Sequence, residues 1–196
     1  FCFIGLSSIS NLNLAQYGID EIKNITLNQM KSLINLFLND NHLIYLNNKL
    51  VDDENRIEIL SLKSNLLKAV PKSALHNLVA CKILILSYNR IERIEKNSFM
   101  YMKSLENLDL NYNQIYLLDG FAFMGLDRVN TLFFLFNPLG TIRNNSFFGL
   151  TSLNILEIFM NQIESFEASA FCGLPNLTSL DVRMNLVTEI HPSLFD

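Results

Sequence analysis

A 24-residue periodicity runs through the whole 196-residue chain. Counted from Ile9, repeats begin at residues 9, 33, 57, 81, 105, 129, 153 and 177, and residues 1–8 fit the end of a preceding repeat. The fourth position of every repeat is leucine, and the sixth, eleventh and fourteenth positions are always apolar. Such a period is the signature of a solenoid, in which each repeat packs against its neighbours. Residues 1–196 are therefore predicted to form a single repeat domain.

The repeat reads L-x-x-L-x-L-x-x-N-x-L, and its columns have distinct physical roles. The L-x-L stretch predicts a short strand with alternate side chains inside and outside, and successive strands are expected to pair in parallel about 4.8 Å apart. The ninth position is asparagine in every repeat after the first. An inward asparagine, where the chain leaves the strand, can satisfy buried backbone groups of its own and adjacent repeats. This column predicts a structural ladder and not a catalytic site.

The nineteenth position forms a second column that is phenylalanine in most repeats. Its members are Phe3, Leu27, Val51, Leu75, Phe99, Phe123, Phe147, Phe171 and Phe195. Because the period of this stripe equals the repeat, it predicts a stacked spine inside the convex side and not a cofactor site.

The full pattern, L-x-x-L-x-L-x-x-N-x-I-x-x-I-x-x-x-x-F-x-x-L-x-x, resembles the leucine-rich repeats of animal extracellular proteins. These include Toll-like receptors, leucine-rich-repeat G-protein-coupled receptors, guidance proteins and matrix proteoglycans. The resemblance implies an α/β-class, curved solenoid with a parallel concave sheet and irregular or 3₁₀ segments on the convex side. It also implies a ligand-binding role for the concave face. The parallel crossover rule predicts a right-handed coil.

Composition and charge exclude several classes of protein. With 49% hydrophobic and only 17% charged residues, the chain is not expected to be disordered. Its net charge of −4 offers phosphate no general attraction, so no nucleic-acid partner is expected. No apolar run approaches the ~18 residues of a membrane helix. The chain begins with Phe and shows no signal peptide, so we expect a piece of a longer protein, attached to a membrane only through other parts.

The sequence offers no constellation for catalysis. The histidines fall at different positions of distant repeats and cannot converge on a metal or a triad: His42, His76 and His191. The cysteines are too far apart along the solenoid for a disulfide, which needs Cα atoms within ~7 Å: Cys2, Cys81 and Cys172. Cys81 occupies a leucine column and is predicted to be a small buried hydrophobe. We expect no enzymatic activity, no metal site and no cofactor.

The eighth position points to a binding surface on the concave face. It is polar in the first three repeats and then aromatic or methionine in the next five, with further apolar residues beside it. The predicted stripe is Tyr88, Tyr112, Phe133, Leu135, Phe136, Phe159, Met160 and Met184. Exposed patches of this kind usually mark interaction sites. A ligand site is favoured; coverage by another module or a second copy, with dimerisation, and the absence of any role stay as alternatives.

Charge is distributed unevenly along the chain. Residues 1–103 hold 12 basic and 9 acidic residues, a net charge of +3, whereas residues 104–196 hold 3 and 10, a net charge of −7. Four acidic residues of the second half are predicted to project from the concave face, against a single Arg183: Glu106, Asp109, Glu157 and Asp181. A cationic peptide or protein with an apolar anchor would suit this face.

Three N-glycosylation motifs occur, which is the number expected by chance in this composition, at Asn24, Asn144 and Asn176. None is predicted to lie on the concave face. The favoured function is ligand recognition by the ectodomain of a cell-surface receptor. A secreted or matrix adhesive protein and a cytosolic scaffold remain alternatives. Because open solenoid ends expose core, the chain alone is expected to oligomerise or aggregate.

Overall fold

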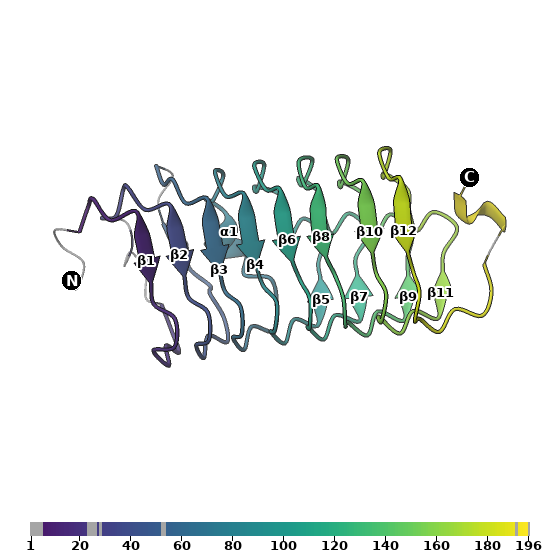
Figure 1. Cartoon of the computed structure of the whole chain (residues 1–196), viewed down its shortest axis with the longest axis horizontal. Coiled ribbons are helices and arrows are strands. Elements are labelled where there is room, and N and C mark those ends of the chain that lie inside the picture. The colour runs from purple at the N-terminus through teal and green to yellow at the C-terminus, as the bar shows by residue number, and fades with distance from the viewer. Residues whose placement is uncertain (1–5, 23–26, 28, 52–53, 191, 196) are drawn as a thin grey trace.

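The computed structural model describes residues 6–22, 27, 29–51, 54–190 and 192–195. Three-residue strands lie side by side in one eight-stranded parallel sheet, in the order β1-β2-β3-β4-β6-β8-β10-β12 (Figure 1). The strands are β1 (Asn11–Asn13), β2 (Asn35–Phe37), β3 (Ile59–Ser61), β4 (Ile83–Ile85), β6 (Asn107–Asp109), β8 (Thr131–Phe133), β10 (Ile155–Glu157) and β12 (Ser179–Asp181).

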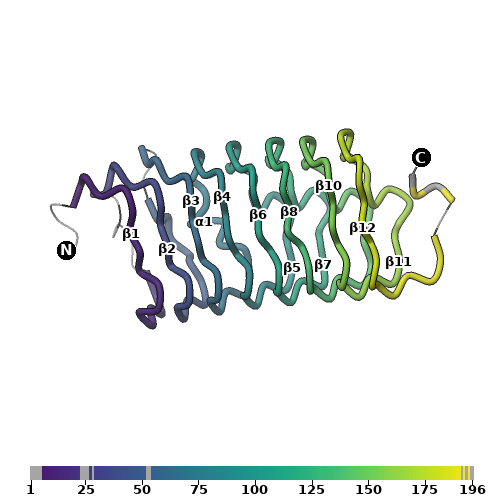
Figure 2. Tube along the Cα trace, in the orientation of Figure 1, coloured from purple at the N-terminus to yellow at the C-terminus, as the bar shows by residue number. Residues whose placement is uncertain are grey.

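Each strand covers the third to fifth positions of a repeat, one residue earlier than the predicted L-x-L stretch at the fourth to sixth positions. The pairing keeps a constant offset of 24 residues, as in Leu36 with Leu60 and Leu108 with Leu132. The Cα trace accordingly makes one coil per repeat (Figure 2). The fourth-position leucine points into the core, and the third and fifth residues face solvent, except that Ser61 in β3 is buried. We call this solvent side of the sheet the front face.

The opposite side is more regular than the predicted irregular or 3₁₀ segments. Two-residue strands pair in parallel there as β5 with β7 and β9 with β11. Their bounds are β5 (Arg93–Ile94), β7 (Leu117–Leu118), β9 (Thr141–Ile142) and β11 (Ser165–Phe166). All four occupy the thirteenth and fourteenth positions, because the 24-residue offset that aligns the front strands also aligns these backbones.

Helical turns occur at the sixteenth to nineteenth positions of two repeats, as α1 (Lys72–Leu75) and the 3₁₀ helix η1 (Pro192–Phe195). Pro71 is the N-cap of α1, and Pro192 is the first residue of η1. Proline is favoured at helix starts because its fixed φ suits the first turn. The 3₁₀ prediction is thus confirmed for η1, while α1 is a short α-helix.

The core confirms the predicted columns. Phe99, Phe123, Phe147 and Phe171 stack with ring centroids 6.0–6.1 Å apart and planes within 5° of parallel. Cys81 is fully buried in its leucine column, and this burial raises the pKa of its thiol to about 12. Cys81 and Cys172 are both free thiols. Cys2, Phe3 and Asn24 lie outside the described residues.

The asparagine ladder is confirmed. Asn65 donates from Nδ2 to the carbonyl oxygens of Leu38 (2.9 Å) and Leu62 (3.1 Å), and its Oδ1 accepts from the Leu43 amide (3.0 Å). Equivalent bonds between adjacent repeats recur from Asn41 to Asn185. Each asparagine therefore ties its own turn to the preceding repeat.

One rung of this ladder is altered beside Pro138. Its neighbour Leu139 donates to the backbone oxygen of Asn161 (2.8 Å), and Asn161 Oδ1 instead accepts from the Asn137 amide (2.8 Å). Proline fixes the backbone φ at this turn, which fits the local change of partner.

Candidate ligand-binding face

The front face presents a column of charged and aromatic side chains at the fifth position of successive strands. Register places Asp109 opposite Phe133, Phe133 opposite Glu157, and Glu157 opposite Asp181. Neighbouring strands lie about 4.8 Å apart, so these four side chains are adjacent. We call them the acidic column. The sheet therefore brings together predicted residues from four separate repeats.

A second row of side chains lies three residues beyond the acidic column, past the carboxyl ends of the strands. Tyr88, Tyr112 and Phe136 form a continuous stack, with centroids 4.5 and 4.4 Å apart and interplanar angles of 12°. We call these three rings the aromatic ladder. Lys63 Nζ caps it, 5.1 Å from the Tyr88 ring centroid. The rings are 39–47% exposed, so their edges face solvent.

The ladder residues have an unusual backbone. All eight eighth-position residues have φ between 53° and 64°, including the three rings, Met160 and Met184. This left-handed bend precedes the inward-turning asparagine of the ninth position. It costs about 1–2 kcal/mol for a side-chain-bearing residue. Ring stacking offsets part of this cost, by about 0.5–1.5 kcal/mol per pair.

The structure thus divides the predicted single stripe into two adjoining rows. The acidic column lies on the sheet, and the aromatic ladder follows the edge formed by the turns after the strands, at the lower side of Figure 1. Of the remaining predicted residues, Met184 is exposed, and Leu135, Phe159 and Met160 are half-buried. A ligand that reaches both rows must span the two residues between them in each repeat.

The carboxylates of this face differ in how far their charge is compensated. Arg183 donates to both oxygens of Asp181 (2.7–3.1 Å), and these hydrogen bonds lower the pKa of Asp181. Asp109 Oδ1 accepts from the Asn111 amide (3.0 Å). Within the described residues, Glu106, Asp109 and Glu157 form no ion pair. These three therefore carry the net negative charge of the face.

The sequence prediction missed one apolar member of the front face. Ile155 in β10 is 52% exposed, in the strand that also carries Glu157. It lies at the third position, which alternates outward with the fifth, so strand alternation was the signal that could have identified it. Ile155 therefore lies beside the acidic column and adds an apolar side chain to the one that Phe133 contributes within it.

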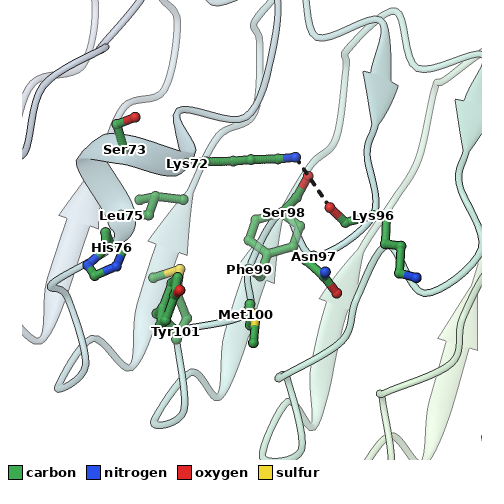
Figure 3. A pocket seen from close by; sticks show the side chains of 11 residues that line it. Lys72, Ser73, Leu75, His76, Lys96, Asn97, Ser98, Phe99, Met100 and Tyr101 are labelled. Carbon is green, nitrogen blue, oxygen red and sulfur yellow. Dashed lines mark hydrogen bonds between the residues drawn. The ribbon is translucent and has the colours of Figure 1, made fainter.

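A pocket of about 400 Å³ opens on the other side of the solenoid, between α1 and the turn at residues 96–102 (Figure 3). Lys72 crosses it to the Glu95 carboxylate (2.6 Å) and the Lys96 carbonyl oxygen (3.3 Å). His76 packs its ring on Tyr101, with centroids 4.1 Å apart, and its Nδ1 lies 2.7 Å from Asn77 Oδ1. The Ser98 hydroxyl donates to the Glu95 carbonyl oxygen. Among the described residues that line the pocket, His76 forms no hydrogen bond with Ser73 or Ser98.

The two described glycosylation motifs lie off the strands. Asn144 is exposed and its Oδ1 accepts from the Ser169 amide (2.9 Å). Asn176 is also exposed and donates to the Thr151 carbonyl oxygen (2.7 Å). A glycan on either side chain would leave the front face open.

Among the described residues, no cluster of three or more His, Cys, Asp or Glu side chains could hold a metal ion. No helix in the described ranges has the length and apolarity to cross a membrane.

Comparison with known proteins agrees with this geometry. The solved structures that match in fold include two of the Toll–Spatzle complex, described as a molecular hub in Drosophila development and innate immunity. The first is 18% identical with a TM-score of 0.76, covering 90% of this chain and 24% of that chain. The second, a glycosylated form, is 19% identical with a TM-score of 0.77, covering 98% of this chain and 29% of that chain. The chain therefore spans about a quarter of their length.

Among curated proteins, none matches the sequence. The leucine-rich repeat family model matches residues 55–115 and 103–163, which together make up more than half of the chain. With its strands, asparagine ladder and phenylalanine spine, the chain belongs to the leucine-rich repeat family.

Proposed function

We propose that this chain is a non-catalytic recognition domain that binds a protein or peptide through the acidic column and the aromatic ladder. The observation that carries this proposal is the adjacency of the two rows over consecutive repeats. Exposed aromatic and methionine side chains are typical of interface centres. Carboxylates without ion pairs beside them favour a cationic partner with an apolar anchor. The net charge of −7 over residues 104–196 acts against a nucleic-acid partner.

The absence of a catalytic role is part of this proposal. The pocket beside α1 holds His76, but this side chain is engaged with Asn77 and Tyr101. The thiol of Cys81 is buried with a raised pKa, so it is a poor nucleophile. The chemistry of the described residues therefore favours binding over turnover.

We further propose that the chain is part of the ectodomain of a cell-surface receptor. Its likeness in fold to Toll, solved in complex with Spatzle, supports a protein ligand and an extracellular location. The exposed motifs at Asn144 and Asn176 are compatible with glycosylation there. A secreted adhesive protein would use the same face, and a cytosolic scaffold would keep the free thiols reduced.

Binding is tested by selecting random peptides displayed on phage against the immobilised intact protein. Selected peptides should be rich in Lys, Arg and apolar residues. For these peptides, Asp109→Lys with Glu157→Lys should lower affinity about tenfold or more at 0.15 M salt, because it reverses two charges at the interface. The remaining affinity should depend less on salt than that of the wild type.

The matched control is Glu164→Lys with Glu189→Lys, which makes the same charge change in the same half of the chain, away from the front face. Both side chains are exposed. At 0.15 M salt this control should change the affinity by less than about twofold, because the screening length is then about 8 Å. Equal losses in the two double variants, or no loss in either, would contradict the proposed site.

Location is tested by separating membrane and soluble fractions of native cells and treating each with an N-glycosidase. A mobility shift in the membrane fraction is expected for a receptor. A shift confined to soluble or matrix material would favour the adhesive protein. An unshifted protein in the cytosol would contradict the extracellular proposal.

A further inference from the structure

The charge of the binding face changes sign along the solenoid. At one end of the aromatic ladder, Lys63 lies over Tyr88, and Arg90 follows Tyr88 by two residues. Asp109 lies on the front face in the repeat of Tyr112, and Glu157 lies there one repeat beyond Phe136. The ladder therefore runs from a basic pole to an acidic pole.

Lys63 and Arg90 are the cations that this end leaves for a partner. Of the other basic side chains of the same two repeats, four are in ion pairs: Lys72 with Glu95 (2.6 Å), Lys82 with Glu58 (2.9 Å), Arg93 with Asp119 (2.8 Å) and Lys103 with Asp127 (3.8 Å). Lys68 and Lys96 form no ion pair with another described residue, but they lie farther from the ladder along their repeats, at the twelfth and sixteenth positions. Lys63 and Arg90 are both exposed, and neither forms an ion pair with another described residue. The Tyr88 ring orients the Lys63 ammonium without neutralising it.

The acidic pole likewise has charged side chains that form no ion pair. Arg183 compensates Asp181, so the charge that remains without an ion pair in the column belongs to Asp109 and Glu157. From β3, which precedes Lys63, to β10, which carries Glu157, there are four strand spacings, or about 19 Å. A segment of about six extended residues spans that distance at 3.3 Å per residue. About thirteen residues span it as an α-helix.

We propose that the ligand segment is itself dipolar, with carboxylates at the Lys63–Arg90 end and basic side chains at the Glu157 end. Its apolar centre lies on the rings of Tyr112 and Phe136. The segment therefore docks in one direction along the solenoid. This inference rests on the proposed function, since it specifies the partner of the same face. A ligand that is only cationic would leave the basic pole unmatched.

The test uses the peptides selected on phage with the intact protein as bait. Acidic residues should be enriched at one end of the selected sequences and basic residues at the other. Lys63→Glu with Arg90→Glu should weaken the binding of these peptides about fivefold to tenfold, as reversal of two exposed charges should. The matched control, Lys49→Glu with Arg56→Glu, reverses one exposed lysine and one exposed arginine away from the ladder and should change binding less than about twofold.

The direction in which a selected peptide lies along the solenoid is measured separately with a photo-crosslinking phenylalanine analogue. Placed at Met184, the analogue should label the basic end of a selected peptide. Placed at Ser64, it should label the acidic end. Labelling of both ends from either position would overturn the dipolar inference.

The failure of this inference is distinguishable from failure of the proposed function. Peptides that depend on Asp109 and Glu157 but not on Lys63 and Arg90 would overturn the inference and leave the proposed function standing. Peptides that depend on neither pair would overturn both.

Discussion

At the scale of the residue, the eighth position of the repeat combines a strained backbone with an exposed side chain. The sequence reveals that this position becomes aromatic from Tyr88 onward. It gives no indication that φ is positive there, since glycine and asparagine, which favour that region, are absent from the column. The three stacked rings and Lys63 are held by one another, whereas Met184 is 68% exposed at the same φ.

Met184→Asn should therefore stabilise the protein by about 0.5–1 kcal/mol, because asparagine tolerates the left-handed region and no stacked contact is lost. Tyr112→Asn relieves the same strain but removes ring contacts on both sides, so it should destabilise the protein or leave its stability unchanged. Urea unfolding of the two variants measures the difference. A Met184→Asn protein less stable than the wild type would contradict this account of the strain.

The Asp181–Arg183 ion pair predicts how the stability of the protein depends on pH. Hydrogen bonds from Arg183 lower the pKa of Asp181 below its ordinary value of 3.8. A lowered folded-state pKa gives a stability contribution that is present above the unfolded pKa and is lost as pH falls through the folded pKa. Arg183→Gln should raise the pKa of Asp181 toward 3.8, as followed by carboxyl-carbon NMR titration. An unchanged titration would show that Arg183 is not the cause.

At the scale of the element, the front strands were predictable and the rear strands were not. The fourth-position leucine and the ninth-position asparagine recur, so they mark the strand and its end in nearly every repeat. The rear strands carry Arg-Ile, Leu-Leu, Thr-Ile and Ser-Phe, which share only an apolar second residue. Their pairing follows from the stacking of coils and not from a local preference. The same stacking places the residues of the predicted binding stripe in two rows, the acidic column and the aromatic ladder.

The asparagine ladder should carry more of the stability in the middle of the solenoid than at its edge. Asn89→Ala leaves the buried amide of Leu67 without its partner. It also removes one of the two side-chain hydrogen bonds accepted by the carbonyl oxygens of Leu62 and Leu86, which keep Asn65 and Asn113 as donors. One unpaired buried group costs about 1–3 kcal/mol and each additional lost hydrogen bond about 0.5–1.5 kcal/mol, so a loss of about 2–4 kcal/mol is expected. Asn185→Ala, where the asparagine is only half-buried, should cost less because water can reach the freed groups. If denaturant unfolding showed equal losses of unfolding free energy in the two variants, burial would not determine the cost of removing the asparagine.

At the scale of the whole molecule, the uneven distribution of charge should affect the association rate and the dissociation rate of a ligand differently. The net charge of −7 over residues 104–196 extends beyond the front face to exposed residues such as Glu164 and Glu189. Long-range fields raise association rates, whereas contacts within an interface set dissociation rates. The two classes of carboxylate are therefore separable by kinetics.

For a cationic selected peptide, Glu164→Lys with Glu189→Lys should slow association at an ionic strength of about 0.01 M, where the screening length is about 30 Å. This effect should vanish at about 0.15 M, and the dissociation rate should stay unchanged throughout. Asp109→Lys with Glu157→Lys should instead speed dissociation at both salt concentrations, because those carboxylates contact the ligand. Stopped-flow measurements at the two concentrations separate these cases. Faster dissociation in the Glu164/Glu189 variant would place the ligand on the rear side of the solenoid, away from the acidic column.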